Sequence, residues 1–326
     1  WSSDVCSSDL STRSLFLQPW FIRQKGAELH RLYQYDVMTV HEYPPFYNGL
    51  GARLLKRATG IPMTMELHHL VGMPHAASCS ELIGRWMTQL LIASHTSSFD
   101  AVRVVNSSVK HQLVAWGVAP HKIHIVPSVY LDHALVDITK NQKKVYDLVF
   151  AARLVDNKGL DSVLRAIAIV PTITLCVIGD GPCRSSAEKL VDDLGIRDRV
   201  TFTGWLPTSE DVAHTIASGK VFVMNSTSEG NPRSAVEAMA YGLPVITTPV
   251  GIMPDIVEEG SNSFFTDGRP ESIAEAMRQC FSSTSLQELG INAQKSVLNR
   301  YEKSSAIRAY ATFLYSVAAL SKNPVR

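Results

Sequence analysis

The sequence predicts an α/β protein built from two doubly wound, Rossmann-like domains in tandem, followed by a helical C-terminal tail. Three observations predict this fold class. Short runs rich in β-branched residues alternate with helical patterns from about residue 36 to residue 266. This alternation is interrupted once, by a polar stretch at 134–146, and after about residue 270 the chain has helical patterns only. Buried runs that alternate with helices are typical of parallel sheets with helices on both faces.

The first domain, at 11–133, contains the first alternating series. Ser80 fits the N-cap of its second helix, with Glu81 in the first turn. The predicted strands cover 35–41 (YDVMTVH), 62–68 (PMTMELH), 101–106 and 122–128, and the predicted helices cover 48–60, 80–98 and 107–116.

Residues 134–146 (ALVDITKNQKKVY) are polar and lack a clear period, so we interpret them as the linker between the domains. The second domain, at 147–303, follows, and a C-terminal helix within 304–326 is expected to return toward the first domain. Strands are predicted at 147–153, 173–180, 199–205, 220–226, 244–248 and 262–266, and helices at about 159–170, 183–194, 209–218, 233–241, 271–282, 285–300 and 304–320. Ligands of open α/β sheets bind at the carboxyl ends of the strands, so motifs that follow strands matter most.

Composition excludes several classes of protein. The net charge of +1 gives no reason to expect a nucleic-acid partner. No run of about 18 uncharged apolar residues predicts a membrane span. The cysteines lack CxxC spacing, which argues against zinc and a disulfide framework and favours a reducing cytoplasm. They are Cys6, Cys79, Cys176, Cys183 and Cys280.

The first ten residues, WSSDVCSSDL, have no periodicity and no apolar region of a signal peptide. The stretch DVCSSDL resembles a translated sequencing adapter. We therefore leave residues 1–10 out of the fold prediction and expect the natural start of the chain to be missing.

A pair of cations follows the first strand of the second domain. Arg153 ends this strand in ARLVDNKGLDSVL, and Lys158 begins the next helix. The start of a helix offers free N–H groups and a partial positive charge. Together with the fork of an arginine and the point charge of a lysine, it would suit a diphosphate. The alternative is a pair of solvated surface cations.

The stretch VIGDGP ends the next strand with Gly179 and Gly181. Glycine allows a ligand or a neighbouring backbone to approach closely. The spacing is not that of a GxGxxG motif, so a dinucleotide-binding role is weakly indicated. The alternative is a tight turn between strand and helix.

Two carboxylates lie in TSEGNPRSAVEAMAYG, after the strand at 220–226. Glu229 lies in the loop with Gly230, Asn231 and Pro232, and Glu237 lies about one turn into the following helix. Carboxylates at strand ends suit the hydroxyl groups of sugars, which donate hydrogen bonds to them. Glu237 alone could instead stabilise the start of its helix, by about 0.3–1 kcal/mol. That alternative leaves Glu229 unexplained.

The stretches AARLVDNKGLDSVLRAI, VIGDGP, VTFTGWLP and STSEGNPRSAVEAMAYGLPVITTPVGIMPDIV resemble the donor domain of the retaining GT-B glycosyltransferases, family 4 (group 1), over about residues 145–290. The resemblance implies two domains that face a cleft. It implies that Arg153 and Lys158 bind the diphosphate of a nucleotide-sugar, that Glu229 contacts the transferred sugar and that Glu237 holds the ribose. It also implies contacts from Gly230, Asn231 and Pro232 to sugar and phosphate, and from Trp205 and Leu206, within 203–206, near the base.

The first domain resembles the acceptor domain of this family more loosely, through YDVMTVHEYPP and MTMELHHL. The family's histidine near the reacting sugar best matches His68, with His69 and His41 as other candidates. A structural histidine is the alternative for His41 and His69. Three departures are Ala152 in place of a glycine, Asn231-Pro232 in place of Phe-Gly, and VYLD at 129–132 in place of Asn-Gly-Val-Asp.

Two features are absent. No strand with a glycine-rich loop is expected between Ser11 and Asp36, which indicates an N-terminally truncated chain. No Asp-x-Asp pair is present, so neither a metal ligand nor another cofactor is predicted. A basic face formed by Arg53, Lys56 and Arg57 could rest on anionic lipid or could be solvated.

These observations predict a cytoplasmic hexosyltransferase, with peripheral contact to the inner face of the membrane as an alternative to a fully dissolved enzyme. Its partners would be a nucleotide-sugar donor and an unknown hydroxyl acceptor, which could be a glycan, a lipid-linked molecule or a small molecule. The predicted catalytic residues are His68, Arg153, Lys158 and Glu229. Alternatives are a non-catalytic nucleotide-sugar-binding fragment and another GT-B enzyme, such as an epimerase or a phosphorylase.

Overall fold

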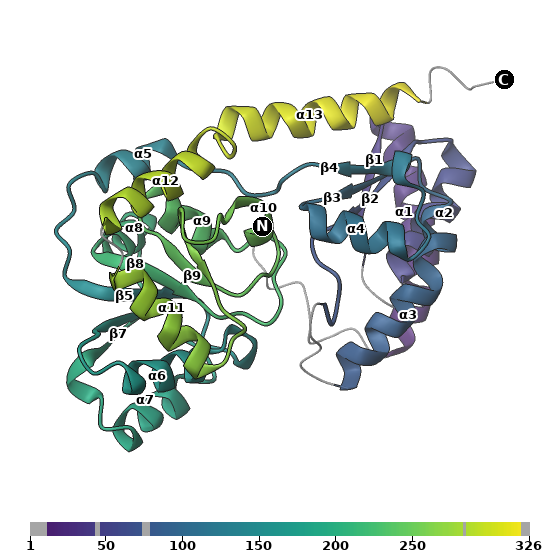
Figure 1. Ribbon diagram of the computed structural model, residues 1–326. Coiled ribbons are helices and arrows are strands. Elements are labelled where there is room, and N and C mark those ends of the chain that lie inside the picture. Colours follow the sequence, from purple (N-terminus) through teal and green to yellow (C-terminus); the bar gives the residue numbers. More distant parts are fainter. Residues whose placement is uncertain (1–11, 43–45, 74–78, 283–284, 321–326) are drawn as a thin grey trace. The chain divides into compact units, whose positions relative to one another are not determined.

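The computed structural model describes residues 12–42, 46–73, 79–282 and 285–320 (Figure 1). The adapter-like residues 1–10 lie outside these ranges. The chain divides into two compact units. The first unit comprises residues up to Gly72, residues 78–126 and residues from Arg308 onward, and the second comprises 73–77 and 127–307.

The first unit is a parallel sheet with helices. The strands, in the spatial order β1-β2-β3-β4, are β1 (Met38–His41), β2 (Met63–Leu67), β3 (Ala101–Val104) and β4 (Ile123–Ile125). The helices are α1 (Thr12–Tyr33), α2 (Tyr47–Thr59), α3 (Cys79–Thr96), α4 (Ser107–Ala115) and the 3₁₀ turn η2 (Pro120–Lys122). α3 begins at Cys79, so Ser80 lies inside its first turn and the N-cap prediction for Ser80 is wrong.

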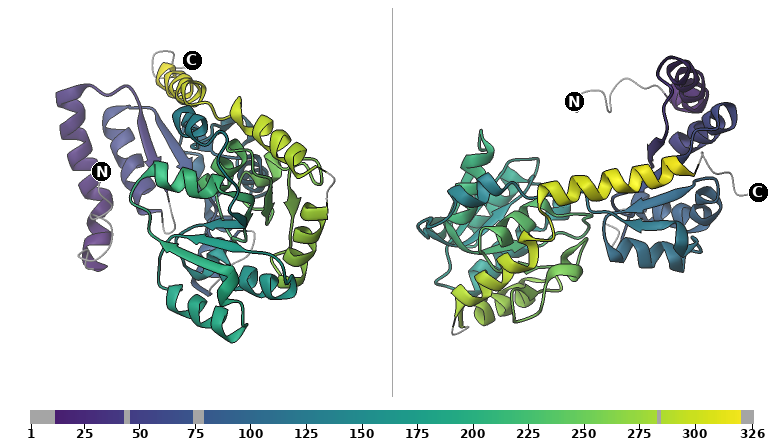
Figure 2. Two further views of the ribbon diagram at one scale, coloured as in Figure 1. Left: turned by 90° about the vertical axis from the view of Figure 1, so that its left-hand side faces the viewer. Right: turned by 90° about the horizontal axis from the view of Figure 1, so that it is seen from above.

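The sequence prediction assigned no element to 12–33, where the structure has α1. This helix contains Pro19 and lies along α2 (Figures 1 and 2). Gly51 of α2 makes room for the contact, because a Cβ at this position would lie 2.8 Å from the Cβ of Ile22. The helix therefore depends on packing against α2, which no local pattern indicates.

The second unit contains a six-stranded parallel sheet in the order β10-β9-β8-β5-β6-β7. The chain starts in the middle, builds outward to β7, and returns to build outward on the other side from β8. The reversal between β5 and β8 is the topological switch point of a doubly wound sheet, where ligands bind. The strands are β5 (Tyr146–Ala151), β6 (Leu175–Ile178), β7 (Val200–Gly204), β8 (Gly219–Met224), β9 (Val245–Thr247) and β10 (Phe264–Phe265).

Helices cover both faces of this sheet because its buried side chains alternate along each strand. Leu148 and Phe150 of β5 pack into one apolar cluster, and Val149 and Ala151 pack into another on the opposite face. The first cluster includes α6 (Leu160–Ile169), α7 (Arg184–Asp193) and α11 (Pro270–Ser282); the second includes α8 (Ser209–Ala217), α9 (Arg233–Ala240), α10 (Met253–Ile256) and α12 (Leu286–Leu298). Two 3₁₀ turns, η3 (Asp156–Lys158) and η4 (Arg197–Arg199), complete the unit.

The stretch interpreted as a linker contains a helix. α5 (His133–Ile138) begins after Asp132, whose carboxylate accepts a hydrogen bond from the backbone N–H of Ala134. Val136 is buried in the apolar cluster of α9. The range predicted as a linker, 134–146, therefore contains most of a short helix that packs on the second unit, and it lies within that unit.

The last helix, α13 (Lys303–Ala319), belongs to the second unit up to Ile307 and to the first unit from Arg308. Within the first unit, its Phe313 and Val317 pack against Ala101 and Val126 of the sheet region. None of the helices in the described residues combines the length and apolar character that a membrane crossing needs.

Candidate functional site

A cavity of about 360 Å³ lies in the second unit at the switch point of its sheet. It opens where β5 and β8 end, between the loops that follow these strands and the first turns of α9. Six residues singled out from the sequence line it together: Arg153, Lys158, Glu229, Asn231, Pro232 and Glu237. Its other lining residues are Phe150, Ala151, Ala152, Val223, Met224, Ser226, Arg233 and Ser234.

Arg153 lies two residues beyond the end of β5. The backbone of its loop contacts the VIGDGP turn at 177–182. Leu154 donates its N–H to Asp180 O at 2.9 Å. Gly179 and Gly181 have φ angles of +121° and +159°, and a Cβ on them would lie 2.0 Å from Ala152 O and 2.3 Å from Leu154 O. Neither glycine lines the cavity. The structure shows that the two glycines allow close contact between backbones at this turn. Their contact with a donor stays a prediction.

The sequence analysis placed Lys158 at the start of the next helix. In the structure, Lys158 instead ends the 3₁₀ turn η3. Gly159 follows with a φ of +63°, and α6 begins at Leu160. The turn directs the ammonium group into the cavity, where it forms an ion pair with Glu229. The two side chains are 22% and 17% exposed.

Glu229 lies in the loop after β8, as predicted. Besides the ammonium of Lys158, its Oε1 accepts a hydrogen bond from Ser226 Oγ at 3.0 Å. One cation and one anion of the predicted site therefore neutralise each other in this structure. A ligand that carries both a phosphate and sugar hydroxyls could engage both groups.

Glu237 lies in the second turn of α9 and pairs with Arg233, which the sequence analysis did not single out. Arg233 Nε lies 2.8 Å from Glu237 Oε1. The hydrogen bond that Arg233 donates to the carboxylate of Glu237 raises the pKa of Arg233, against the effect of burial. The i,i+4 spacing of these two residues on one helix is the signal that could have identified Arg233.

The loop between Glu229 and α9 is held by contacts with its neighbours. The amide group of Asn231 lies 2.8 Å from Ser128 Oγ. Gly230 O lies close to Gly251, where a Cβ would come within 2.4 Å of it. Pro232, with a φ of −69°, immediately precedes α9. The backbone at the mouth of the cavity is thus fixed on both sides of Gly230.

Trp205 and Leu206 follow β7, outside the residues that line the cavity. Trp205 is 75% exposed, and Leu206 packs against the apolar cluster of α9. A large exposed indole beside a strand end is available for stacking on a planar ligand.

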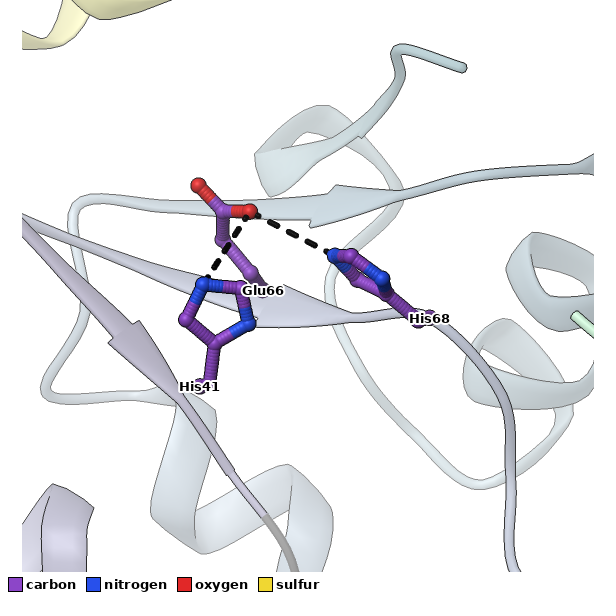
Figure 3. A group of neighbouring side chains, drawn as sticks. All are labelled: His41, Glu66 and His68. Atoms are coloured by element: carbon purple, nitrogen blue, oxygen red, sulfur yellow. Dashed lines mark ion pairs between the residues drawn. The ribbon is translucent and has the colours of Figure 1, made fainter. Parts of the chain in front are cut away.

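His68 belongs to the first unit, one residue beyond the end of β2, and His69 follows it. His41 ends β1. Figure 3 shows His41 and His68 turned toward the carboxylate of Glu66. Six of the predicted site residues of the second unit line one cavity, whereas His41 and His68 form a separate group in the first unit.

Both parts of the chain match family models. The model described as "Glycosyl transferases group 1" matches residues 134–296, and the model described as "Glycosyl transferase 4-like domain" matches residues 9–128. These matches agree with the resemblance found in the second domain and with the looser one found in the first.

Among curated relatives, the lipopolysaccharide core biosynthesis glycosyltransferase LpsE of Rhizobium meliloti is 30% identical over 190 residues, 58% of this chain. The chain spans only 54% of the length of that protein. The N-acetyl-alpha-D-glucosaminyl L-malate synthase of Bacillus anthracis is 24% identical over 87% of this chain and 83% of its own.

Solved structures share the fold. Anabaena Alr3699/HepE in complex with UDP aligns with a TM-score of 0.72 and 19% identity, over 90% of this chain and 81% of its own. Sucrose-phosphate synthase from Thermosynechococcus elongatus aligns with a TM-score of 0.79 and 20% identity, over 96% and 81%. These likenesses confirm the predicted fold class: two parallel-sheet, Rossmann-like domains of the GT-B type.

Proposed function

Because the chain belongs to the group 1 glycosyl transferases, we propose that it transfers a hexose-type sugar from a nucleoside-diphosphate sugar to a hydroxyl acceptor, with retention of configuration and without a metal ion. The enzyme class, glycosyltransferase, follows from the family. The donor, the stereochemistry and the independence from metal are the proposal.

The observation that carries the proposal is the cavity at the switch point. It gathers three cations, Arg153, Lys158 and Arg233, with two carboxylates, Glu229 and Glu237. Guanidinium and ammonium groups bind phosphate oxygens, and carboxylates accept hydrogen bonds from sugar hydroxyls. A nucleotide-sugar carries both kinds of group. The complexes of Alr3699/HepE with UDP and with UDP-glucose support this class of ligand.

In the proposed mechanism, Arg153 and Lys158 stabilise the charge that develops on the diphosphate as the bond to the sugar breaks. Cations fixed in advance are effective because they need no rearrangement during the reaction. Glu229 would orient the transferred sugar and Glu237 the ribose. His68 is assigned to the reacting sugar on the family resemblance. The acceptor hydroxyl attacks the sugar carbon, and its proton leaves with the nucleoside diphosphate.

Lipid contact by the basic face of α2 stays a prediction. The structure reduces the number of cations on this face that could meet a lipid. Lys56 Nζ lies 2.6 Å from Asp100 Oδ2, so its charge is already paired. Arg53 and Arg57 are the remaining cations of the predicted patch.

Binding of free nucleotide tests the proposal. Arg153→Ala and Lys158→Ala should each weaken the binding of UDP or GDP by about 10- to 150-fold, because a hydrogen bond to a charged group contributes about 1.5–3 kcal/mol. Arg278→Ala is the matched control, since Arg278 lies on the exposed surface of α11, paired with Glu275. Calorimetric titration gives the affinities, and thermal unfolding checks that each variant is folded. Unchanged affinity in both cavity variants would contradict the diphosphate assignment.

A further inference from the structure

Three side chains of the first unit converge at the carboxyl ends of β1 and β2 (Figure 3). His41 and Glu66 are direct neighbours in the register of the two parallel strands. Glu66 and His68 are two residues apart, so they point to the same side of the sheet. The backbone therefore places two imidazoles around one carboxylate. The order of these residues in the sequence does not by itself show that they are neighbours.

The donor atoms of this group are close together. His68 Nε2 lies 3.6 Å and His41 Nε2 lies 3.9 Å from the same oxygen, Glu66 Oε2. One ligand atom from each residue lies within 4.8 Å of the others. The side chain of Glu66 is 1% exposed, whereas those of His68 and His41 are 38% and 58% exposed. The group is thus anchored in the protein and open to solvent on the side of the histidines.

The carboxylate is fixed from behind by two residues. Arg103 Nη1 lies 2.6 Å from Oε2, and the hydroxyl of Tyr310 donates a hydrogen bond to Oε1. The guanidinium lies 4.3 Å from the centre of the Tyr310 ring. Both oxygens of the carboxylate are thus held by hydrogen bonds from residues behind it.

We propose that His41, Glu66 and His68 form a binding site for a single transition-metal ion of the Zn²⁺ class. Two histidines and one glutamate are a known ligand set for zinc, with bonds of about 2.0–2.2 Å. Tetrahedral bonds of this length place donor atoms about 3.4 Å apart. The observed separations, 3.6 and 3.9 Å from the carboxylate oxygen and at most 4.8 Å among the three atoms, require the two partly exposed rings to move closer together. Arg103 and Tyr310 supply the outer hydrogen bonds that hold a ligating carboxylate.

Arg103 makes the site selective. Its charge already balances that of Glu66, so the attraction of the carboxylate for a hard cation is largely cancelled. Mg²⁺ and Ca²⁺ depend on oxygen ligands, whereas Zn²⁺, Co²⁺ and Ni²⁺ bind well to imidazole. The two histidines should therefore supply most of the affinity, and the site should discriminate against Mg²⁺ and Ca²⁺.

The ion would take no part in the proposed transfer, although its site includes His68. The cavity that would bind the donor belongs to the second unit, and its cations belong to Arg153, Lys158 and Arg233. Transfer in the presence of a chelator therefore stays expected. One consequence rests on the proposed function: an ion on His68 would withdraw that imidazole, so added Zn²⁺ should slow transfer and EDTA should restore it. Zn²⁺ binding without inhibition would contradict the role of His68 and leave the metal site intact.

The decisive experiment is a calorimetric titration of the full chain with ZnCl₂ in a buffer that does not bind metal. We expect one equivalent to bind, and His41→Ala and His68→Ala each to weaken binding by at least about 10- to 100-fold, the loss typical even of an outer partner. His121→Ala is the matched control, because His121 lies in the exposed turn η2 of the same unit. Variants of the histidines are preferred to changes at Glu66, which would remove the carboxylate that balances the charge of the buried Arg103.

Two results would overturn the assignment. One is equal Zn²⁺ affinity in the parent and in the double variant His41→Ala/His68→Ala, with both folded by thermal unfolding. The other is a loss in the His121→Ala control as large as in the ligand variants. Equal binding of Mg²⁺ and Zn²⁺ would refute the selectivity argued from Arg103. Absorption of bound Co²⁺ that changes in His68→Ala but is retained in His121→Ala would support the ligand set directly.

Discussion

Changing each of the two glutamates of the cavity to glutamine should affect different binding affinities. Glu229→Gln should leave the affinity for free UDP or GDP unchanged or raise it, and should weaken the intact sugar donor. Glu237→Gln should weaken both ligands. The reason is position: Glu229 lies in the loop after β8 beside Lys158, whereas Glu237 lies inside α9 beside Arg233.

The size of the effect follows from what glutamine keeps. Its carbonyl oxygen still accepts a hydrogen bond from a sugar hydroxyl, but without charge. A hydrogen bond to a charged group contributes about 1.5–3 kcal/mol and a neutral one about 0.5–1.5 kcal/mol. The loss is therefore about 1–1.5 kcal/mol, roughly 5- to 12-fold in Kd. Both glutamates are 17% exposed, so solvent screens this difference only in part.

Calorimetric titration of each variant with a nucleoside diphosphate and with the matching nucleotide-sugar measures the four affinities. Glu275→Gln is the control, because Glu275 forms an exposed ion pair with Arg278 on α11, remote in sequence from the cavity. Equal losses for both ligands in both variants would refute the division of labour. If only Glu229→Gln lost affinity for free nucleotide, the roles assigned to the two glutamates would have to be exchanged.

Two further predictions test the metal requirement and the loop that carries Arg153. Transfer should continue in excess EDTA, because cations of the chain meet the diphosphate; complete loss that Mn²⁺ or Mg²⁺ restores would contradict this. Gly179→Ala should destabilise the protein and weaken nucleotide binding, because the φ of +121° disfavours a side chain and its Cβ would lie 2.0 Å from Ala152 O. Gly195→Ala is the control, with a φ of +64° and no atom within 4 Å of a Cβ; it should lower stability by about 1–2 kcal/mol and leave binding unchanged, and equal binding losses in the two variants would refute the argument.

The strands and most helices could be predicted because each leaves a local pattern of buried residues. The helix α1 could not, since it contains Pro19 and its place is set by packing against α2. The short helix α5 was missed because a single buried valine, Val136, gives no period. Sequence patterns thus predicted what short windows determine and missed what tertiary packing determines.

The same limit applies to the sites. Motifs at strand ends identified Arg153, Lys158, Glu229 and Glu237, because parallel strands end at one edge of a sheet. The partner of Glu66 on α13, Tyr310, is 244 residues away in the sequence. No periodicity joins positions so far apart, so the group around Glu66 is visible only in the folded chain.

The ion pair between Lys158 and Glu229 gives the proposed site a means of choosing its ligand. Both side chains are largely buried, and a buried charge without a partner is costly. A free nucleoside diphosphate can satisfy Lys158 only by leaving Glu229 without its cation. A nucleotide-sugar can replace both partners at once, because its phosphate meets Lys158 and its sugar hydroxyls meet Glu229. Discrimination then arises from the penalty on the incomplete ligand, which is why removing the charge of Glu229 should favour free nucleotide over the donor.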